Sequence, residues 1–158
     1  MQYLSIIEGD LLESKETFIA HQCNCVSTDS KGFAKTIFSK YPFSNSYTKR
    51  IRGKKETYSE PGSIEIFNNG EKCIINMYAQ YYPSASKYSN DTKTKRIEWF
   101  INCLDNISKI SDIKSKIIAM PFHIGCGLAG GDWNVYYNII EEFANKEEIQ
   151  IVLYKMRI

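Results

Sequence analysis

Short apolar runs alternate along this chain with segments in which apolar residues recur every three or four positions. Runs of the first kind are rich in β-branched residues and indicate buried strands; they lie at 3–7, 17–21, 63–67, 73–78, 116–120 and 149–155. Segments of the second kind indicate amphipathic helices; they lie at 33–38, 97–107 and 135–143, and 43–50 is a further short candidate. This alternation of strands and helices predicts an α/β fold.

One pair of strands is predicted to be antiparallel. Asn69-Gly70 stands between the apolar runs 63–67 and 73–78, and this dipeptide is typical of a hairpin turn. The central sheet is therefore expected to be mixed, with helices on both faces, as in a three-layer α/β/α sandwich. Because no internal repeat or long linker divides the chain, we expect residues 1–158 to form a single domain.

Charge and cysteine content narrow the class of protein. The formal net charge is only +2, so nothing favours strong non-specific binding to nucleic acid. The densest basic run, 49–55, is expected to be a solvated loop, with contact to a polyanion as the alternative. An odd number of cysteines, five, favours reduced thiols. No apolar stretch is long enough to span a membrane, and we expect a cytoplasmic monomer, or a nuclear one if the source is eukaryotic or viral.

A loop with four glycines follows the apolar run 116–120 and precedes a helical segment, at Gly125–Gly131. Glycines let backbone N–H groups turn toward one point without a Cβ in the way, and a helix N-terminus adds further unpaired donors. Strand, glycine loop and helix together predict a cradle for a diphosphate. The alternative is a tight turn between strand and helix that binds no ligand.

The predicted topology gathers three such connections. In open α/β sheets, ligands bind beyond the carboxyl ends of the strands. The loops after Ile7, His21 and Met120 all leave predicted strands at those ends. We therefore expect the ligand site where these three loops converge.

The ordered motifs in these loops resemble those of a known family. They are Glu8-Gly9-Asp10-Leu11-Leu12, His21-Gln22-Cys23-Asn24-Cys25 leading to Lys31-Gly32-Phe33-Ala34, the loop Gly125–Gly131, and the closing Ile151-Val152-Leu153-Tyr154. Over nearly the full length this order resembles the macro domain, a module that binds ADP-ribose. It is most similar to the branch that holds ADP-ribose 1″-phosphate phosphatases and terminal ADP-ribose glycohydrolases. The resemblance implies a macro-domain-like fold and a site that needs neither cofactor nor metal.

The resemblance also implies roles for individual residues. Asp10 matches the aspartate that binds the adenine amino group, Tyr154 the aromatic residue beside adenine, and Asn24 the asparagine that contacts the distal ribose. From the residues alone, Asp10 could instead be a turn or helix-cap aspartate, and Tyr154 a sheet-edge packing residue. The other expected substrate-binding residues are Leu11, Gly32, Phe33, Ala34, Ile124, Gly125, Cys126, Gly127, Leu128 and Ala129.

Two residues are candidates for catalysis. His21 is similar to the histidine of the phosphatase branch, and its side chain suits proton transfer or phosphate contact near neutral pH. Asp132 matches the aspartate of Gly-x-Asp-Trp loops in related members and would activate a water at the distal ribose. The alternatives are a buried structural histidine and an aspartate that caps the following helix.

A metal site built on His21, Cys23 and Cys25 is a further alternative. Structural zinc sites usually take Cys-x2-4-Cys pairs together with a second pair of ligands. The spacing here is tighter, and His123 and Cys126 would complete a site only by a coincidence of fold. We therefore expect no metal.

This chain departs from the glycohydrolase class in two ways. The catalytic lysine of that class aligns with Ala79 and its partner aspartate with Ala129, so the amine that Schiff-base chemistry requires is absent there. Of the Gly-Gly-Gly that many members carry before the first helix, only Gly32 remains.

The expected function is that of a hydrolase that binds ADP-ribose and removes a substituent from its distal ribose. It would act as an ADP-ribose 1″-phosphate phosphatase or as an ADP-ribosyl hydrolase. The alternative is a non-catalytic reader of ADP-ribose or ADP-ribosylation. The expected partner is ADP-ribose or an ADP-ribosylated substrate, with nucleic acid entering only as the modified molecule. A third hypothesis is single-strand binding through 49–55 and the tyrosines at 78–88.

Overall fold

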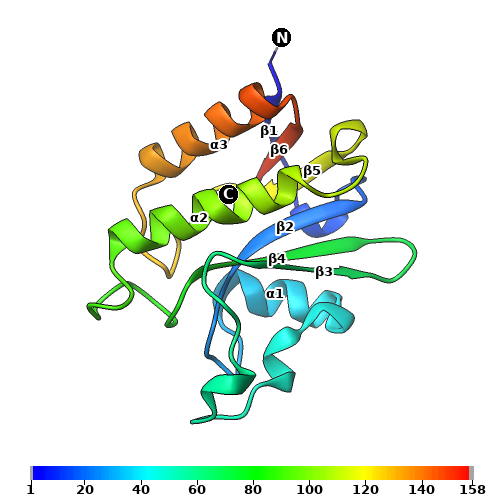
Figure 1. The fold of residues 1–158 in the computed structure, drawn as a ribbon. Helices are drawn as coiled ribbons and strands as arrows, with labels where there is room; N and C mark the ends of the chain where they lie inside the picture. The colour runs from blue at the N-terminus through cyan, green and yellow to red at the C-terminus, as the bar shows by residue number, and fades with distance from the viewer. Residues whose placement is uncertain (1, 157–158) are drawn as a thin grey trace.

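The computed structural model describes residues 2–156, which form one mixed sheet covered by helices (Figure 1). The strands are β1 (Leu4–Glu8), β2 (Phe18–Asn24), β3 (Ile64–Asn68), β4 (Cys73–Gln80), β5 (Ile117–Pro121) and β6 (Gln150–Lys155). The α-helices are α1 (Gly32–Lys40), α2 (Lys93–Ser108) and α3 (Trp133–Glu147). Short 3-10 helices lie at η1 (Leu11–Glu13), η2 (Pro42–Ser44), η3 (Ser46–Lys49), η4 (Lys55–Thr57) and η5 (Ile113–Ser115).

The sheet has the strand order β1-β6-β5-β2-β4-β3. Neighbouring strands run parallel except β3 and β4, which are antiparallel. In their hairpin, the backbone N–H of Asn69 donates to the carbonyl of Lys72 at 3.1 Å. The mixed sheet and the hairpin predicted from the sequence are thus confirmed.

Helices cover both faces of the sheet. In Figure 1, α2 and α3 lie on one side, while α1 and the segment that follows it lie on the other. One apolar core fills the side of α2 and α3, around Ile75, Met77 and Phe100. A second core fills the side of α1, around Ile19, Ile37 and Phe38. This arrangement confirms the three-layer sandwich.

Two local predictions need correction. The segment 43–50 forms η2 and η3 rather than one α-helix, because Asn45 interrupts it and its side chain accepts a hydrogen bond from the backbone N–H of Tyr47. Strand β2 runs to Asn24, three residues beyond the predicted end at His21. Gln22, Cys23 and Asn24 therefore hold fixed positions at the carboxyl end of a central strand.

Five neighbouring strands, β1, β6, β5, β2 and β4, are parallel, so they end at the same edge of the sheet. The connections that leave this edge carry the predicted site. No helix within residues 2–156 is long and apolar enough to cross a lipid bilayer.

Candidate functional site

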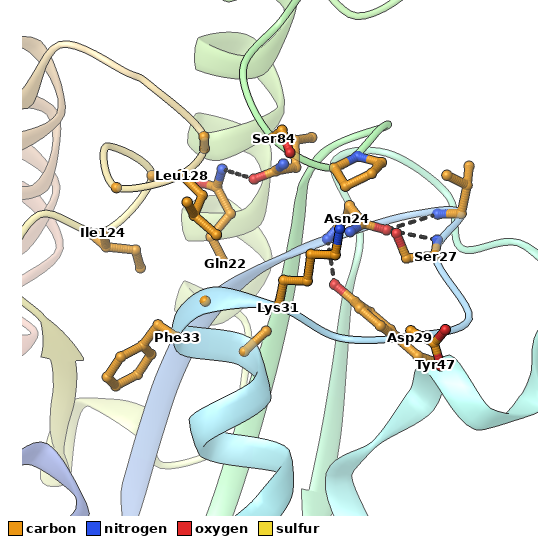
Figure 2. A pocket seen from close by; sticks show the side chains of 18 of the residues that line it. Gln22, Asn24, Ser27, Asp29, Lys31, Phe33, Tyr47, Ser84, Ile124 and Leu128 are labelled. Carbon is orange, nitrogen blue, oxygen red and sulfur yellow. Dashed lines mark hydrogen bonds between the residues drawn. The ribbon is translucent and has the colours of Figure 1, made fainter.

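A cleft of about 540 Å³ opens at this edge. It lies between two sides that come from separate crossings of the sheet (Figure 2). We call the lining residues between 24 and 34 the α1 wall, and those between 121 and 129, with Gln80, Pro83 and Ser84, the loop wall. Gln22 also lines the cleft, as do Tyr47, Arg52 and Tyr58, and we call the part that these last three residues line its outer end.

The N-terminus of α1 forms part of the α1 wall. Gly32, Phe33 and Ala34 line the cleft, and Lys31 precedes them without a capping hydrogen bond from its side chain. The first N–H groups of a helix have no partner within the helix, and together with the helix dipole they favour an anion. Gly32 has a φ of +61°, in the left-handed region that favours glycine. This wall is therefore suited to phosphate oxygens.

The glycine-rich loop contributes to the loop wall, opposite the N-terminus of α1. Gly125 has a φ of +79°, and a Cβ there would lie 2.7 Å from Cε2 of Tyr136 and 3.0 Å from Oε1 of Gln22. The N–H of Gly131 donates to the carbonyl of Gly125 at 3.1 Å, which closes the loop on itself. Leu128 reaches across to the other wall, where its Cδ1 lies 2.8 Å from the place a Cβ on Gly32 would take. The two walls thus meet above the cleft.

Asn24 presents one polar group to the cleft. Its Oδ1 accepts hydrogen bonds from the backbone N–H groups of Val26 at 3.1 Å and Ser27 at 2.8 Å. Its own backbone N–H donates to the hydroxyl of Tyr47 at 2.8 Å, as Figure 2 shows. Because donors surround Oδ1, the amide nitrogen Nδ2 is the group left for a ligand. Asn24 is thus a donor here, and not both donor and acceptor as its chemistry alone allows.

Most of the expected substrate-binding residues line this one cleft. They are Asn24, Gly32, Phe33, Ala34, Ile124, Gly125, Gly127, Leu128 and Ala129. Cys126 does not line it; its Sγ packs toward Gly131, and burial raises the pKa of its thiol to about 11. Asp10, Leu11 and Tyr154 also lie outside the lining.

The residues expected at adenine nevertheless lie together. The N–H of Gly9 donates to the carbonyl of Lys155 at 3.0 Å, and the Tyr154 ring lies 3.8 Å from where a Cβ on Gly9 would be. Asp10 caps η1, accepting from the N–H of Leu12 at 3.0 Å. Leu11 is buried in the core on the α1 side, against which Tyr154 also packs. Burial and a 2.8 Å hydrogen bond to Glu16 raise the pKa of Tyr154 to about 12, so its hydroxyl is neutral.

His21 lies on the side of β2 that faces α1, outside the cleft lining. Its side chain is 1% exposed, its Nε2 is 2.8 Å from Oδ1 of Asn76, and its ring packs edge-on against Phe38. Burial lowers its pKa to about 4, although the hydrogen bond with Asn76 acts in the opposite direction. The imidazole is therefore neutral at physiological pH, in the environment of a structural histidine.

Asp132 lies at the N-terminus of α3, also outside the cleft lining. Its carboxylate accepts a hydrogen bond from the backbone N–H of Asn134 at 3.0 Å, so it caps the helix. The anion-binding helix end at this cleft is consequently that of α1, and not that of the helix that follows the glycine loop.

The thiols have no arrangement typical of a metal site. Sγ of Cys23 lies 3.7 Å from Nε2 of His21, but burial raises the pKa of Cys23 well above its usual value and that of Cys25 to about 12. Within residues 2–156, no group of three or more His, Cys, Asp or Glu side chains is placed to hold a metal ion.

Two glutamines in the cleft were not expected from the sequence. Nε2 of Gln22 donates to Oε1 of Gln80 at 2.7 Å, and Nε2 of Gln80 donates to the carbonyl of Tyr82 at 2.9 Å. This order of donors leaves Oε1 of Gln22 as an acceptor, buried and without a partner among the described residues. The longer β2 is the signal that places Gln22 at the cleft.

A buried ion pair braces the loop wall and was also missed. Arg96 and Asp91 contact at 2.6 Å, and Arg96 donates to the carbonyls of Ser84 at 2.8 Å and Ala129 at 3.2 Å. Arg96 thereby joins the segment after β4 to the glycine loop. A signal existed in the sequence: Arg96 precedes Phe100 by four positions, which places it on the apolar stripe of α2.

Searches with the sequence match no family model. The chain is 28% identical to a DNA ADP-ribosyl transferase–DNA ADP-ribosyl glycohydrolase fusion protein of Thermosipho africanus, over 97% of this chain and 42% of that protein. It therefore spans less than half the length of that relative. It is 26% identical to an uncharacterized 17.5 kDa protein of Enterobacteria phage T4, over 92% of this chain and 93% of the phage protein.

Solved structures share the fold over nearly the whole chain. A Bacteroides thetaiotaomicron protein has a TM-score of 0.76 and 25% identity, covering 96% of this chain and 99% of that one. The macrodomain of Mycobacterium tuberculosis DarG has a TM-score of 0.71 and 22% identity, covering 98% of both chains. Thermosipho africanus DarTG in complex with ADP-ribose has a TM-score of 0.69 and 21% identity, covering 98% of this chain and 42% of that one. The chain therefore has the fold of these macrodomains.

Proposed function

We propose that the cleft binds ADP-ribose and that the chain hydrolyses the bond between the distal ribose and an attached group. The observation that carries this proposal is the meeting of the N-terminus of α1 with the loop around Gly125 across one cleft. A diphosphate needs donors on two sides, and a helix N-terminus and a glycine-rich loop are elements that supply them. The ADP-ribose complex of Thermosipho africanus DarTG, which has the same fold, supports this choice of ligand.

The orientation of the ligand follows from the residues at and beyond the cleft. The adenine lies beyond the lining, toward Asp10 and Tyr154, which follow the neighbouring strands β1 and β6 or end them at the same edge of the sheet. The distal ribose lies toward Nδ2 of Asn24 and beside Gln22, which also lines the cleft. An amide N–H of this kind donates to a ribose hydroxyl.

The attached group lies at the outer end of the cleft, near Arg52 and Tyr58. A cation and an aromatic ring suit a nucleotide, whose phosphate and base they contact. We therefore assign an ADP-ribosylated nucleic acid as substrate, which agrees with the DNA ADP-ribosyl glycohydrolase named in the Thermosipho africanus relative. ADP-ribose 1″-phosphate is the second substrate class that the same cleft would admit.

The reaction proposed is displacement by water. Water adds to C1″ of the distal ribose, the bond from C1″ to the attached group breaks, and that group leaves with a proton. Ala79 and Ala129 provide no amine or carboxylate, so rate enhancement comes from holding ribose and water in place. Nδ2 of Asn24 is the donor that holds the ribose. His21 has a structural role in this proposal.

A reader without turnover is the second candidate, because His21 and Asp132 both lie outside the cleft lining. Calorimetry with ADP-ribose, ADP and AMP tests the binding site, and we expect the tightest binding for ADP-ribose. Release of ADP-ribose from ADP-ribosylated single-stranded DNA, and of phosphate from ADP-ribose 1″-phosphate, tests turnover. Binding without release of either product would identify a reader. An absence of ADP-ribose binding would overturn the proposal as a whole.

A further inference from the structure

Arg50 is a buried cation beside the α1 wall that forms no ion pair within residues 2–156. The residue is 5% exposed, and its Nε is buried without a hydrogen-bond partner. A buried charge is costly unless its donors are paired. The partners of its other nitrogens therefore indicate what this arginine is for.

Those partners converge on Asn24. Nη2 donates to the backbone carbonyl of Asn24 at 2.8 Å, and Nη1 lies 3.3 Å from its Oδ1. The same fork donates to the carbonyl of Ser27 at 3.0 Å and to the hydroxyl of Ser59 at 2.8 Å. Its carbon Cζ lies 4.2 Å from the ring centroid of Tyr47, which in turn accepts from the N–H of Asn24.

These contacts of Arg50 and Tyr47 fix the orientation of the Asn24 side-chain amide. If the amide were turned over, Nδ2 would face Arg50 and the N–H groups of Val26 and Ser27, so that donors would face donors. With Arg50 in place, Oδ1 and both backbone groups of Asn24 are engaged. Nδ2 is then held ready as a donor in the cleft, without a loss of side-chain freedom when the ligand binds.

We propose that Arg50 is a positioning residue that gives the cleft its preference for a distal ribose by orienting Asn24. The inference rests on the proposed function, in that it takes ADP-ribose as the ligand. Arg50 acts through the shape of its planar fork, which a lysine cannot reproduce even though it keeps the charge. A purely electrostatic role would instead be preserved in lysine.

The test compares ADP-ribose with ADP, which lacks the distal ribose, by calorimetry on the wild type, Arg50→Lys and Lys54→Met. Lys54 is an exposed cation of the same segment and serves as the matched control. We expect Arg50→Lys to lower the affinity for ADP-ribose about tenfold, the loss of one good hydrogen bond. We expect its affinity for ADP to stay within about twofold of the wild type. Lys54→Met should bind both ligands as the wild type does.

Other outcomes overturn the inference in distinct ways. Wild-type affinity for both ligands in Arg50→Lys would mean that the charge suffices, and equal losses for both would mean a merely structural role. A wild type that binds neither ligand would instead remove the proposed function. If Arg50→Lys does not fold, nitrogen-15 spectra of the wild type decide: the Asn24 side-chain amide must shift with ADP-ribose and not with ADP. The same shift with both ligands, or no shift with either, would end the inference.

Discussion

The two walls of the cleft are each braced by a buried arginine, but the two arginines are held in different ways. Arg96, at the loop wall, pairs with the carboxylate of Asp91. Arg50, at the α1 wall, is held by carbonyl and hydroxyl oxygens and an amide, without a paired carboxylate in the described chain. Breaking a buried pair leaves a charge uncompensated, whereas neutral partners only orient a charge. The loop wall therefore depends on electrostatic pairing, and the α1 wall on geometry.

The reach of the two arginines differs as well. Arg96 donates to Tyr82, Ser84 and Ala129, so it joins parts of the chain that are far apart in sequence. Arg50 donates mainly to the short stretch Asn24–Ser27, and also to the hydroxyl of Ser59. Loss of Arg96 or of Asp91 should consequently destabilise the whole loop wall. Loss of Arg50 should instead weaken one contact with the ligand.

The largest effect is expected from Asp91→Asn. The substitution leaves Arg96 buried without a counter-charge and should lower the free energy of unfolding by about 3–5 kcal/mol, measured by urea denaturation at neutral pH. Burial alone raises the pKa of Asp91, but hydrogen bonds from Arg96 and from the backbone of Tyr82 and Tyr81 lower it overall. The stabilisation is therefore present above the unfolded pKa of about 4 and is lost as the pH falls below it.

Glu13→Gln is the matched control for this prediction. Glu13 pairs with Lys40 at 3.7 Å, and both side chains are well exposed, 77% and 39% respectively. An exposed pair contributes less than about 1 kcal/mol. If Asp91→Asn destabilised the protein no more than Glu13→Gln does, the ion pair of Arg96 would not stabilise the loop wall, and the contrast with Arg50 would have no energetic basis.

The second prediction concerns the pH dependence of the α1 side. His21 is buried in its neutral form with a pKa of about 4, whereas an unfolded chain takes up that proton near pH 6.5. The contribution of neutral His21 to the free energy of unfolding is therefore complete above pH 6.5. About 3 kcal/mol of it is lost as the pH falls toward 4. We expect His21→Gln to flatten the curve of unfolding free energy against pH between 6.5 and 4, measured by urea titrations at several pH values.

The exposed His123, on the loop wall, provides the comparison. His123 has a φ of +69°, which asparagine also tolerates, so His123→Asn is the matched variant. It should keep the wild-type slope. An unchanged slope in His21→Gln would mean that the loss of stability in this range comes from other groups.

Much of the α1 wall could be predicted because its residues lie in one continuous motif. The sequence from His21 to Ala34 places Asn24 and the start of α1 together by connectivity alone. What the motif could not reveal is that β2 continues to Asn24, so that its last residues alternate between the two faces of the sheet. This alternation puts Gln22 in the cleft and His21 on the opposite face, against Phe38.

The burial of the two arginines, by contrast, could not be predicted, because charged residues are usually exposed. Arg50 belongs to a basic run that is expected to be solvated, and Arg96 to a helix start rich in lysine. Burial of either depends on carbonyls and, for Arg96, on a carboxylate that only the folded chain brings within reach. Periodicity identifies the buried face of α2, but the residue type argues against burial, and tertiary hydrogen bonds decide the outcome.

The third prediction tests whether the loop wall needs its glycines for geometry. In Gly125→Ala, the left-handed φ alone costs about 1–2 kcal/mol, and the new methyl group would meet Tyr136 and Gln22. We expect a loss of unfolding free energy of about 2 kcal/mol and at least a tenfold loss of ADP-ribose affinity, followed by thermal unfolding and calorimetry. Gly127→Ala, where a Cβ would meet no protein atom within 4 Å, should leave the unfolding free energy unchanged. An equal loss of unfolding free energy in the two variants would show that the close packing of the loop over Gln22 is unimportant for its stability.

The smallest effect is expected where the two walls meet, at Leu128. Its side chain is 63% exposed although it lies against Gly32, so Leu128→Ala should change the unfolding free energy by less than about 0.5 kcal/mol. A residue that closes over a bound ligand acts mainly on its escape, because affinity differences among variants of one site lie mostly in the dissociation rate. We expect ADP-ribose to dissociate several-fold faster from Leu128→Ala, with the association rate nearly unchanged, in stopped-flow measurements. Ile101→Ala, an exposed apolar residue on α2 away from the cleft, should leave both rates as they are. A slower association with an unchanged dissociation rate would mean that Leu128 belongs to the entrance of the cleft, and that the two walls act on the ligand independently.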